Sequence, residues 1–223
     1  PWYETNAYSS SATLQSKMNT ISSAYSELSK SRSEYVQFYM KNHEQIPTWI
    51  MIKVVNFSTF IDVLHNSKTN VTHAICKLYS MYDDNNLPNV KLLIGSLHWL
   101  RRVRNSCAHN ERVYCIHQTQ ARNNSASGRI LDPYYTQLPT SYSRCTEKNI
   151  FDILVYFKYF LPTEEFTPMI IELKNMLIEL QNTLQTNAFD NVRGQMGIKN
   201  LNVLDALIAL PKSKIEYHKF DTL

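Results

Sequence analysis

Glycine is scarce in this chain, and that scarcity constrains the fold more than any other feature of the sequence. The 223 residues contain four glycines, where average usage near 7% would give about 16. Folds rich in β-structure use glycine at turns and bulges, so the composition favours helices. We predict an all-α protein, and the length suits a single helical domain over residues 1–223.

The spacing of apolar residues predicts where the helices lie. The predicted helices cover residues 13–42, the stretch "TWIMIKVVNFSTFIDVLHN" after Pro47, 70–80, about 89–114, 147–160, Thr167 and Pro168 to about 185, and a turn or so around "NVLDALIAL". The segment after Pro47 is apolar on most sides and is therefore expected to be central. Residues 117–146 form a polar stretch rich in Asn, Ser, Gly and Pro. A loop of this length inside a compact domain is usually functional or mobile.

The net charge of +4 and the pI of about 8.8 are too mild to indicate nucleic-acid binding by themselves. Most of the excess could come from residues 98–112, where four arginines face a single acid, Glu111. The four cysteines form no CxxC pair, and no secretory signal or membrane-length apolar run is evident. We therefore expect a cytoplasmic protein with reduced thiols and no membrane association.

The segment "RRVRNSCAHNERVY", residues 101–114, concentrates this charge on one side of a helix. With Arg104 at zero on a helical wheel, the other polar residues fall between about 60° and 140°. In order of angle they are Arg101, Arg112, Asn105, His98 and His109. The opposite arc holds Trp99, Val103 and Cys107, which are expected to face the core.

A solvated helix face is the simplest interpretation of such a pattern, but three features oppose it here. Solvated faces usually mix acids with bases, whereas this face has no acid between His98 and Asn110. Arginine is suited to forked recognition of phosphate or carboxylate, and histidine titrates near neutrality. A zinc site is disfavoured because Cys107 and His109 would point about 160° apart on one helix. We predict no metal and no cofactor.

The string "RNSCAH" resembles the RX4–6H signature of the HEPN ribonucleases. The wider string "LRRVRNSCAHNERVY" resembles more narrowly the bacterial Abi-type (AbiD/AbiF-like) abortive-infection family. The matching positions are Leu100, Arg101, Arg104, Asn105, Cys107, Ala108, His109 and Arg112. Upstream, "PTWIMIKVVNFSTFIDVLHN" resembles another family segment and departs from it at Lys53, Asn56 and Ser58. The opening "PWYE" resembles a position inside the family pattern, which implies a missing N-terminal region.

The resemblance implies a HEPN-like bundle that forms a homodimer, with two motif helices facing each other across a composite RNA-cleaving site. His109 would then act as base or acid, Arg104 would hold phosphate oxygens, and Asn105 would orient the histidine or the phosphate. Arg101, Arg112 and His98 would add RNA affinity. The implied activity is metal-independent cleavage of RNA through attack by the 2′-OH. The implied role is that of a toxin in phage defence, and the partner could be an antitoxin protein or RNA.

Two other functions remain open for the same residues. The cationic face could belong to a non-catalytic RNA-binding module. It could also be a purely structural dimer helix, for which changes at Trp99 or Val103 would matter more than changes at Arg104 or His109.

Overall fold

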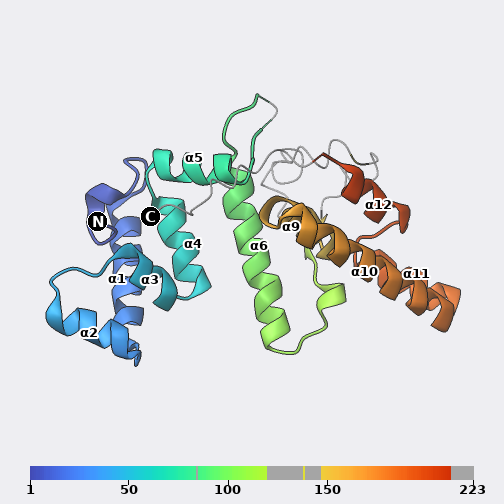
Figure 1. Ribbon diagram of the computed structural model, residues 1–223, viewed down its shortest axis with the longest axis horizontal. Helices are drawn as coiled ribbons and strands as arrows, with labels where there is room; N and C mark the ends of the chain where they lie inside the picture. Colours follow the sequence, from blue (N-terminus) through green and yellow to red (C-terminus); the bar gives the residue numbers. More distant parts are fainter. Residues whose placement is uncertain (84, 120–137, 139–146, 212–223) are drawn as a thin grey trace. The chain divides into compact units, whose positions relative to one another are not determined.

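The computed structural model describes residues 1–83, 85–119, 138 and 147–211, and within them the prediction of an all-α protein is confirmed (Figure 1). Most of the polar stretch 117–146 lies outside the described residues. We predicted one domain over 1–223; the structure groups the chain into two compact units, Pro1–Ile75 and Cys76–Leu223. Each unit is described by itself.

The first unit is built from short helices. They are η1 (Thr5–Ala7), α1 (Leu14–Lys30), α2 (Glu34–Asn42), α3 (Thr48–Val54), α4 (Phe57–Asn66) and the beginning of α5 (Thr69–Leu78), which crosses the boundary between the units. The prediction of a helix over 70–80 agrees with α5 to within about two residues.

The single helix predicted over 13–42 is wrong, because the chain breaks at Ser31 and continues as α2. Ser31 has extended backbone (φ −66°, ψ 129°), and neither glycine nor proline marks the break. The break resets the helical phase, so the apolar residues of the predicted stripe do not share one buried face. Leu28, before the break, is fully buried, whereas Phe38, after it, is 56% exposed.

The segment after Pro47 also forms two helices rather than one, with the break at Val55. Asn56 caps the second helix, since its Oδ1 accepts from the Thr59 amide at 3.0 Å. The Glu27 carboxylate accepts from the Asn56 side chain at 2.6 Å, from the Thr59 hydroxyl at 2.5 Å and from the Asn56 amide. This places a negative charge at the N-terminus of α4, where the helix dipole favours it.

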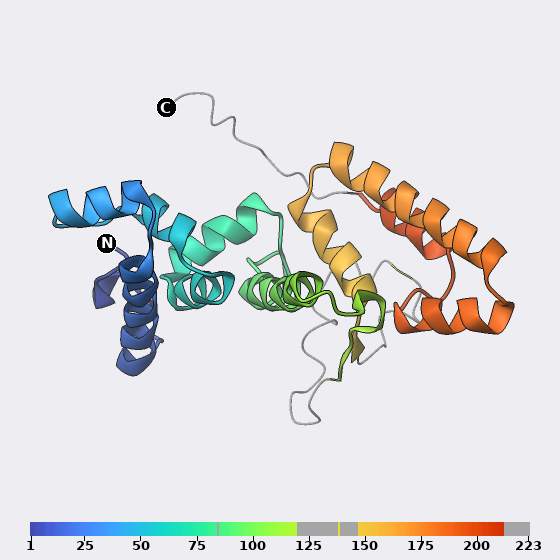
Figure 2. The same ribbon diagram turned by 90° about the horizontal axis from the view of Figure 1, so that it is seen from below.

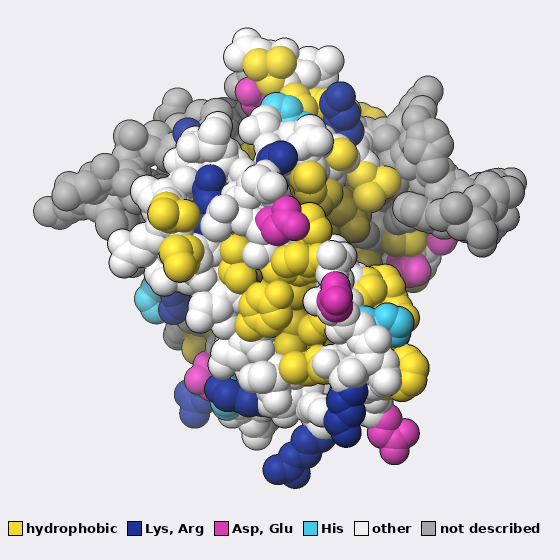
Figure 3. All heavy atoms as spheres, turned by 90° about the vertical axis from the view of Figure 1, so that its left-hand side faces the viewer, with side chains coloured by type: hydrophobic (Ala, Val, Ile, Leu, Met, Phe, Trp, Pro, Cys, Tyr) yellow, Lys and Arg dark blue, Asp and Glu magenta, His cyan; other side chains and the backbone are white. Residues whose placement is uncertain are grey.

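The core of the first unit forms around Trp2 and the helices α1 to α3. It contains Trp2, Ala24, Leu28, Val36, Ile46, Ile50, Met51 and Val55. The indole of Trp2 donates to the Ile46 carbonyl at 2.8 Å, which ties the N-terminus to the segment before α3. Hydrophobic side chains also gather on the molecular face drawn in Figure 3. The first unit encloses a small core and leaves several apolar residues in solvent, among them Met18, Phe38 and Trp49.

The second unit contains the motif helix and a group of helices that follow it (Figure 2). Its elements are α6 (Val90–Ala108), η2 (Val113–Cys115), β1 (Gln118–Thr119), β2 (Glu147–Lys148), α9 (Ile150–Phe160), α10 (Thr163–Thr183), α11 (Thr186–Gln195) and α12 (Asn202–Ala209). The two-residue strands pair antiparallel, with Gln118 opposite Lys148. This pairing joins the end of the motif segment to the residues just before α9.

Helix α9 is the central element of the second unit, and most of its residues are buried. It begins with a capping box: Asn149 Oδ1 accepts from the Phe151 amide at 3.1 Å, and Asp152 Oδ2 accepts from the Asn149 amide at 2.7 Å. The buried Lys158 donates to the carbonyl of Leu207 at 2.7 Å, in the last turn of α12. A cation is favourable at that end of a helix dipole.

Helix α10 begins at Thr163, five residues before Pro168, the predicted first helical residue, so that prediction is wrong. Pro162 precedes the helix, and Glu164 and Glu165 occupy its first turn, where acidic side chains are favourable. Pro168 lies inside the helix and removes one backbone donor there. Helix α12 packs along α10 (Figure 2).

Candidate nucleic-acid interface

The motif helix α6 changes character along its length. It begins after Asn89, whose side-chain oxygen accepts from the Leu92 amide at 2.9 Å. Its first half is largely buried. From His98 onward only one face is buried, represented by Trp99 at 2% and Val103 at 9% exposure. The second half of α6 therefore presents a polar face, as the sequence predicts.

Helix α6 ends at Ala108 instead of continuing to about 114, which corrects the prediction. Asn110 adopts a left-handed conformation (φ 55°), and its amide donates to the Cys107 carbonyl at 3.1 Å. The Glu111 amide donates back to the Ser106 carbonyl at 2.9 Å. These two bonds form a Schellman motif, in which asparagine is among the few residues besides glycine that tolerate the turn. His109 is therefore the C-terminal cap of the helix.

The prediction that Cys107 faces the core is wrong, because its side chain is exposed. The buried arc of the last turn is carried by Val103 and Ser106 instead. The Ser106 hydroxyl donates to Glu111 Oε2 at 2.5 Å, so the residue after the Schellman turn folds back against the helix. Cys107 lies at the border of that arc and faces solvent.

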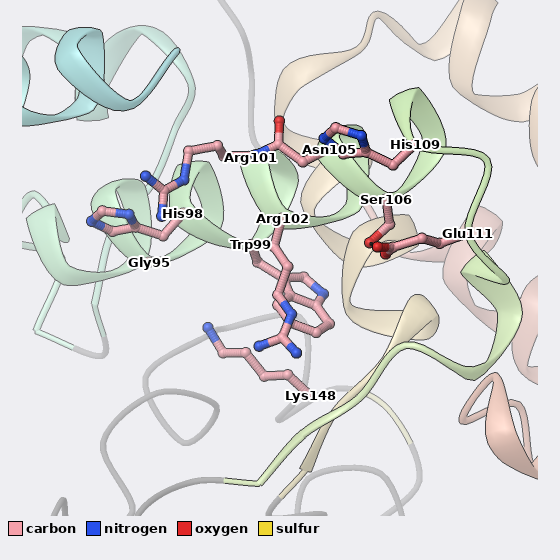
Figure 4. Close-up of a pocket in the computed structure, with 10 residues that line it drawn as sticks. All are labelled: Gly95, His98, Trp99, Arg101, Arg102, Asn105, Ser106, His109, Glu111 and Lys148. Atoms are coloured by element: carbon pink, nitrogen blue, oxygen red, sulfur yellow. Dashed lines mark hydrogen bonds between the residues drawn. The ribbon is translucent and has the colours of Figure 1, made fainter. Parts of the chain in front are cut away.

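A cleft of about 580 Å³ lies along the polar side of α6 (Figure 4). Its lining residues are Gly95, His98, Trp99, Arg101, Arg102, Asn105, Ser106, His109, Glu111 and Lys148. Among the lining residues that the structure describes, there are three permanent cations, two histidines and one carboxylate, and that carboxylate accepts the Ser106 hydroxyl. An open cleft with this balance suits an anionic ligand.

Four of the six residues predicted for the site line this cleft: His98, Arg101, Asn105 and His109. In Figure 4, Asn105 and His109 lie next to each other along one edge of α6. Their spacing is fixed by the helix, because the His109 amide donates to the Asn105 carbonyl at 3.0 Å.

The other two predicted residues lie outside the lining. Arg104 is exposed, and its Nη1 donates to Asn105 Oδ1 at 3.2 Å, so it is joined to the cleft through that amide. Arg112 follows the Schellman turn and precedes η2, and its side chain is exposed. The wheel placed Arg112 beside Arg101, but a wheel has no meaning beyond the last helical residue.

Sequence reasoning missed Arg102 and Lys148 as components of the site. Arg102 was counted in the local charge, but it falls near 160° on the wheel, outside the polar arc. Its Cζ lies 5.5 Å from the centroid of the Trp99 ring, and its Nη2 donates to the His117 carbonyl at 3.4 Å. Lys148 comes from β2, and its Nζ lies 5.6 Å from the Tyr156 ring centroid. No local signal in the sequence places Lys148 against α6.

The described residues offer no group of three or more His, Cys, Asp or Glu side chains that could hold a metal ion. Cys107 and His109, which raised the question of zinc, are both exposed.

The model of the family described as "Abi-like protein" matches residues 2–115 of this chain. The chain therefore belongs to the Abi-like protein family, and the match includes all the residues of the motif helix. Membership suggests a role in abortive infection, a defence against phage. No curated protein and no solved structure gives a significant match. Within the described part of the chain, no helix is long and apolar enough to cross a membrane.

Proposed function

We propose that this chain is a metal-independent endoribonuclease and a toxin of abortive infection. One observation carries the proposal: Asn105 and His109 face the same cationic cleft, and Arg104 is hydrogen-bonded to Asn105. These contacts link Arg104 and His109, the two fixed residues of the RX4H signature, through the intervening Asn105. The family supports the role in phage defence, and the chemistry of the cleft supports RNA as the substrate.

The reaction needs a base for the ribose 2′-OH and cations for the phosphate. The His109 imidazole accepts the 2′-OH proton while the 2′ oxygen attacks the adjacent phosphorus. The bond to the 5′ oxygen breaks, and that oxygen leaves with a proton. The products are a 2′,3′-cyclic phosphate and a 5′-hydroxyl end. Because DNA lacks the 2′-OH, the enzyme would cleave RNA only.

Arg104 and Asn105 stabilise the charge that builds on the phosphate. The guanidinium of Arg104 can hold two phosphate oxygens with parallel N–H donors. Asn105 Oδ1 accepts one Arg104 donor, which orients the guanidinium beside the cleft. Arg101, Arg112 and His98 contribute to RNA binding through phosphate contacts.

The proposed site is completed by a homodimer. One imidazole that takes up the 2′-OH proton cannot protonate the leaving 5′ oxygen in the same step. His109 of a second copy would supply that proton across a composite cleft. The same basic surface could accept an inhibitory antitoxin protein or RNA.

A non-catalytic RNA-binding module is the alternative, and the cationic lining of the cleft is the observation that favours it. The two functions separate at His109. For an enzyme, His109→Ala lowers cleavage by at least about 100-fold while RNA binding persists. For a binding module, the parent chain binds RNA and never cleaves it, and Arg104→Ala weakens that binding.

The test is RNA cleavage in excess chelator, followed on a gel, by the parent chain, Arg104→Ala and His109→Ala. His65→Ala and Arg32→Ala are the matched controls, since both residues are exposed and belong to the first unit. Cleavage by the parent and the controls, with loss in both motif variants, supports the proposal. Full activity of His109→Ala, or equal cleavage of DNA, refutes it.

A further inference from the structure

Two cations in the cleft are not part of the family's motif. Arg102 projects from α6, and Lys148 reaches the same cleft from β2. Figure 4 shows both side chains on one side of α6, with Asn105 and His109 along the other edge. The cleft therefore carries positive charge at two places, one beside the proposed reacting groups and one away from them.

Both cations line the cleft and lie against buried aromatic rings. The Arg102 guanidinium lies against the buried Trp99 ring and donates to the His117 carbonyl, which orients its fork. The Trp99 indole donates to the Asn149 carbonyl at 3.0 Å, so this support is itself anchored to the residue after Lys148. The Lys148 ammonium lies over the ring of Tyr156, a buried residue of α9, at 5.6 Å from the ring centroid.

The Lys148 ammonium lies beside Gly95 of helix α6. A Cβ atom built on Gly95 would lie 3.8 Å from Lys148 Nζ, which is ordinary van der Waals contact. The backbone of Gly95 is helical and needs no glycine. The size of the side chain at position 95 is therefore what matters. Alanine fits beside Lys148, whereas a branched side chain would occupy the same part of the cleft as the Lys148 ammonium.

We propose that Arg102 and Lys148 form a second phosphate subsite, which binds a phosphodiester of the RNA strand away from the bond that is cleaved. This inference rests on the proposed function, because it assumes that RNA occupies the cleft. A planar fork and a compact ammonium are the two groups that proteins use to bind phosphate. The substrate is then a strand that follows α6 from His109 toward Gly95, about 21 Å along the helix axis, rather than a dinucleotide.

The experiment measures RNA binding in a chain that cannot cleave. Arg102→Gln and Lys148→Gln are combined in the His109→Ala background, and the affinity for a single-stranded oligoribonucleotide is followed by fluorescence anisotropy at several salt concentrations. Removal of one cation that binds a phosphate should reduce the slope of log K against log salt by about 0.7. We expect a reduction of about 1.4 for the pair, and almost no change for a dinucleotide with one phosphodiester.

Three controls separate a binding role from a structural one. Lys30→Gln with Arg32→Gln removes the same two charges from exposed positions of the first unit and should leave the slope unchanged. Gly95→Ala should bind normally, whereas Gly95→Leu should weaken binding of the oligonucleotide. Arg102→Lys with Lys148→Arg keeps the charge and should retain the salt slope. Thermal melts of every variant confirm that each one is folded.

The cleavage and binding experiments test the ribonuclease proposal and the subsite proposal separately. If the parent cleaves RNA while the slope of the glutamine pair is unchanged, the subsite is wrong and the ribonuclease proposal stands. If the slope falls and the parent chain with His109 intact does not cleave RNA, the subsite stands and the catalytic proposal is wrong. A parent chain that binds no RNA at all overturns both.

Discussion

Substitution of Gly197 tests whether Asn149 supports the residues that line the cleft. Gly197 follows helix α11, has φ of 78°, and its amide donates to the Gly194 carbonyl at 3.0 Å. A Cβ atom at Gly197 would lie 2.2 Å from both Oδ1 and Nδ2 of Asn149. Asn149 caps α9, accepts the Trp99 indole and follows Lys148 directly. Gly197→Ala should therefore disturb the support of the cleft as well as the turn.

The expected cost has two parts. An alanine in the left-handed region costs about 1–2 kcal/mol. Displacement of the Asn149 side chain removes a helix cap, which costs about 1 kcal/mol. Together they predict that Gly197→Ala lowers the free energy of unfolding by about 2–3 kcal/mol, or roughly 4–12 °C in Tm. Urea denaturation, followed by circular dichroism, measures the change.

Gly194→Ala is the matched control, because a Cβ there meets nothing within 4 Å. Since Gly194 lies in the last turn of α11, alanine should stabilise the protein by up to about 1 kcal/mol. Asn149→Ala tests the cause: in that background the cost of Gly197→Ala should shrink by about 1 kcal/mol, because the cap is already absent. Equal effects of the two glycine substitutions, or a cost that Asn149→Ala leaves unchanged, would refute the reasoning.

Three further predictions follow from individual residues. Burial raises the pKa of the Cys76 thiol to about 11. Iodoacetamide at pH 8 should therefore modify the exposed Cys107 and spare Cys76, as measured by peptide mass mapping. Equal labelling of the two cysteines would contradict this prediction. Burial also raises the pKa of Tyr8 to about 12. The unfolded chain loses both protons first, so the free energy of unfolding should fall by about 2–3 kcal/mol between pH 8 and pH 10.5. A flat profile in urea titrations would argue against this. Asn110→Gly should keep the turn after α6 and leave the melting temperature close to that of the parent. Asn110→Val should lower the free energy of unfolding by about 1–2 kcal/mol, because valine does not tolerate the left-handed backbone. Equal melting temperatures of the two variants would contradict this prediction.

The sequence predicts the helical class and the place of several helices, but not where the longest ones break. The low glycine count predicts helices, and the apolar runs locate α5 and α9. The breaks at Ser31 and Val55 carry neither glycine nor proline, and both residues simply turn to extended backbone. At the second break a tertiary contact determines where the new helix begins. The Glu27 carboxylate accepts hydrogen bonds from Asn56 and Thr59, which favours an N-terminus of α4 at this point. This stabilisation depends on a partner 29 residues away and leaves no local pattern.

Some residues of the candidate site could likewise be predicted from the sequence, and others could not. Asn105 and His109 could be predicted to share a face because they belong to one helix, and the helix geometry alone fixes their relation. Lys148 could not be predicted, since β-pairing with Gln118 and packing against Tyr156 bring it to α6. Arg112 shows the opposite failure: it belongs to the motif, and the wheel placed it in the site.

The reason for that failure is the αL turn at Asn110, which also determines what Arg112 can do. The turn sends Glu111 back to Ser106 and leaves Arg112 at the start of a separate short helix, outside the cleft lining. A residue held that way can meet a phosphate farther along a bound strand, but in this chain it does not line the cleft that holds His109. The arginines of one continuous motif are therefore divided by the fold, with Arg104 tied to the Asn105 amide, Arg101 in the cleft and Arg112 beyond it. The motif string supplies the candidate residues, and the end of helix α6 decides which of them line the same cleft.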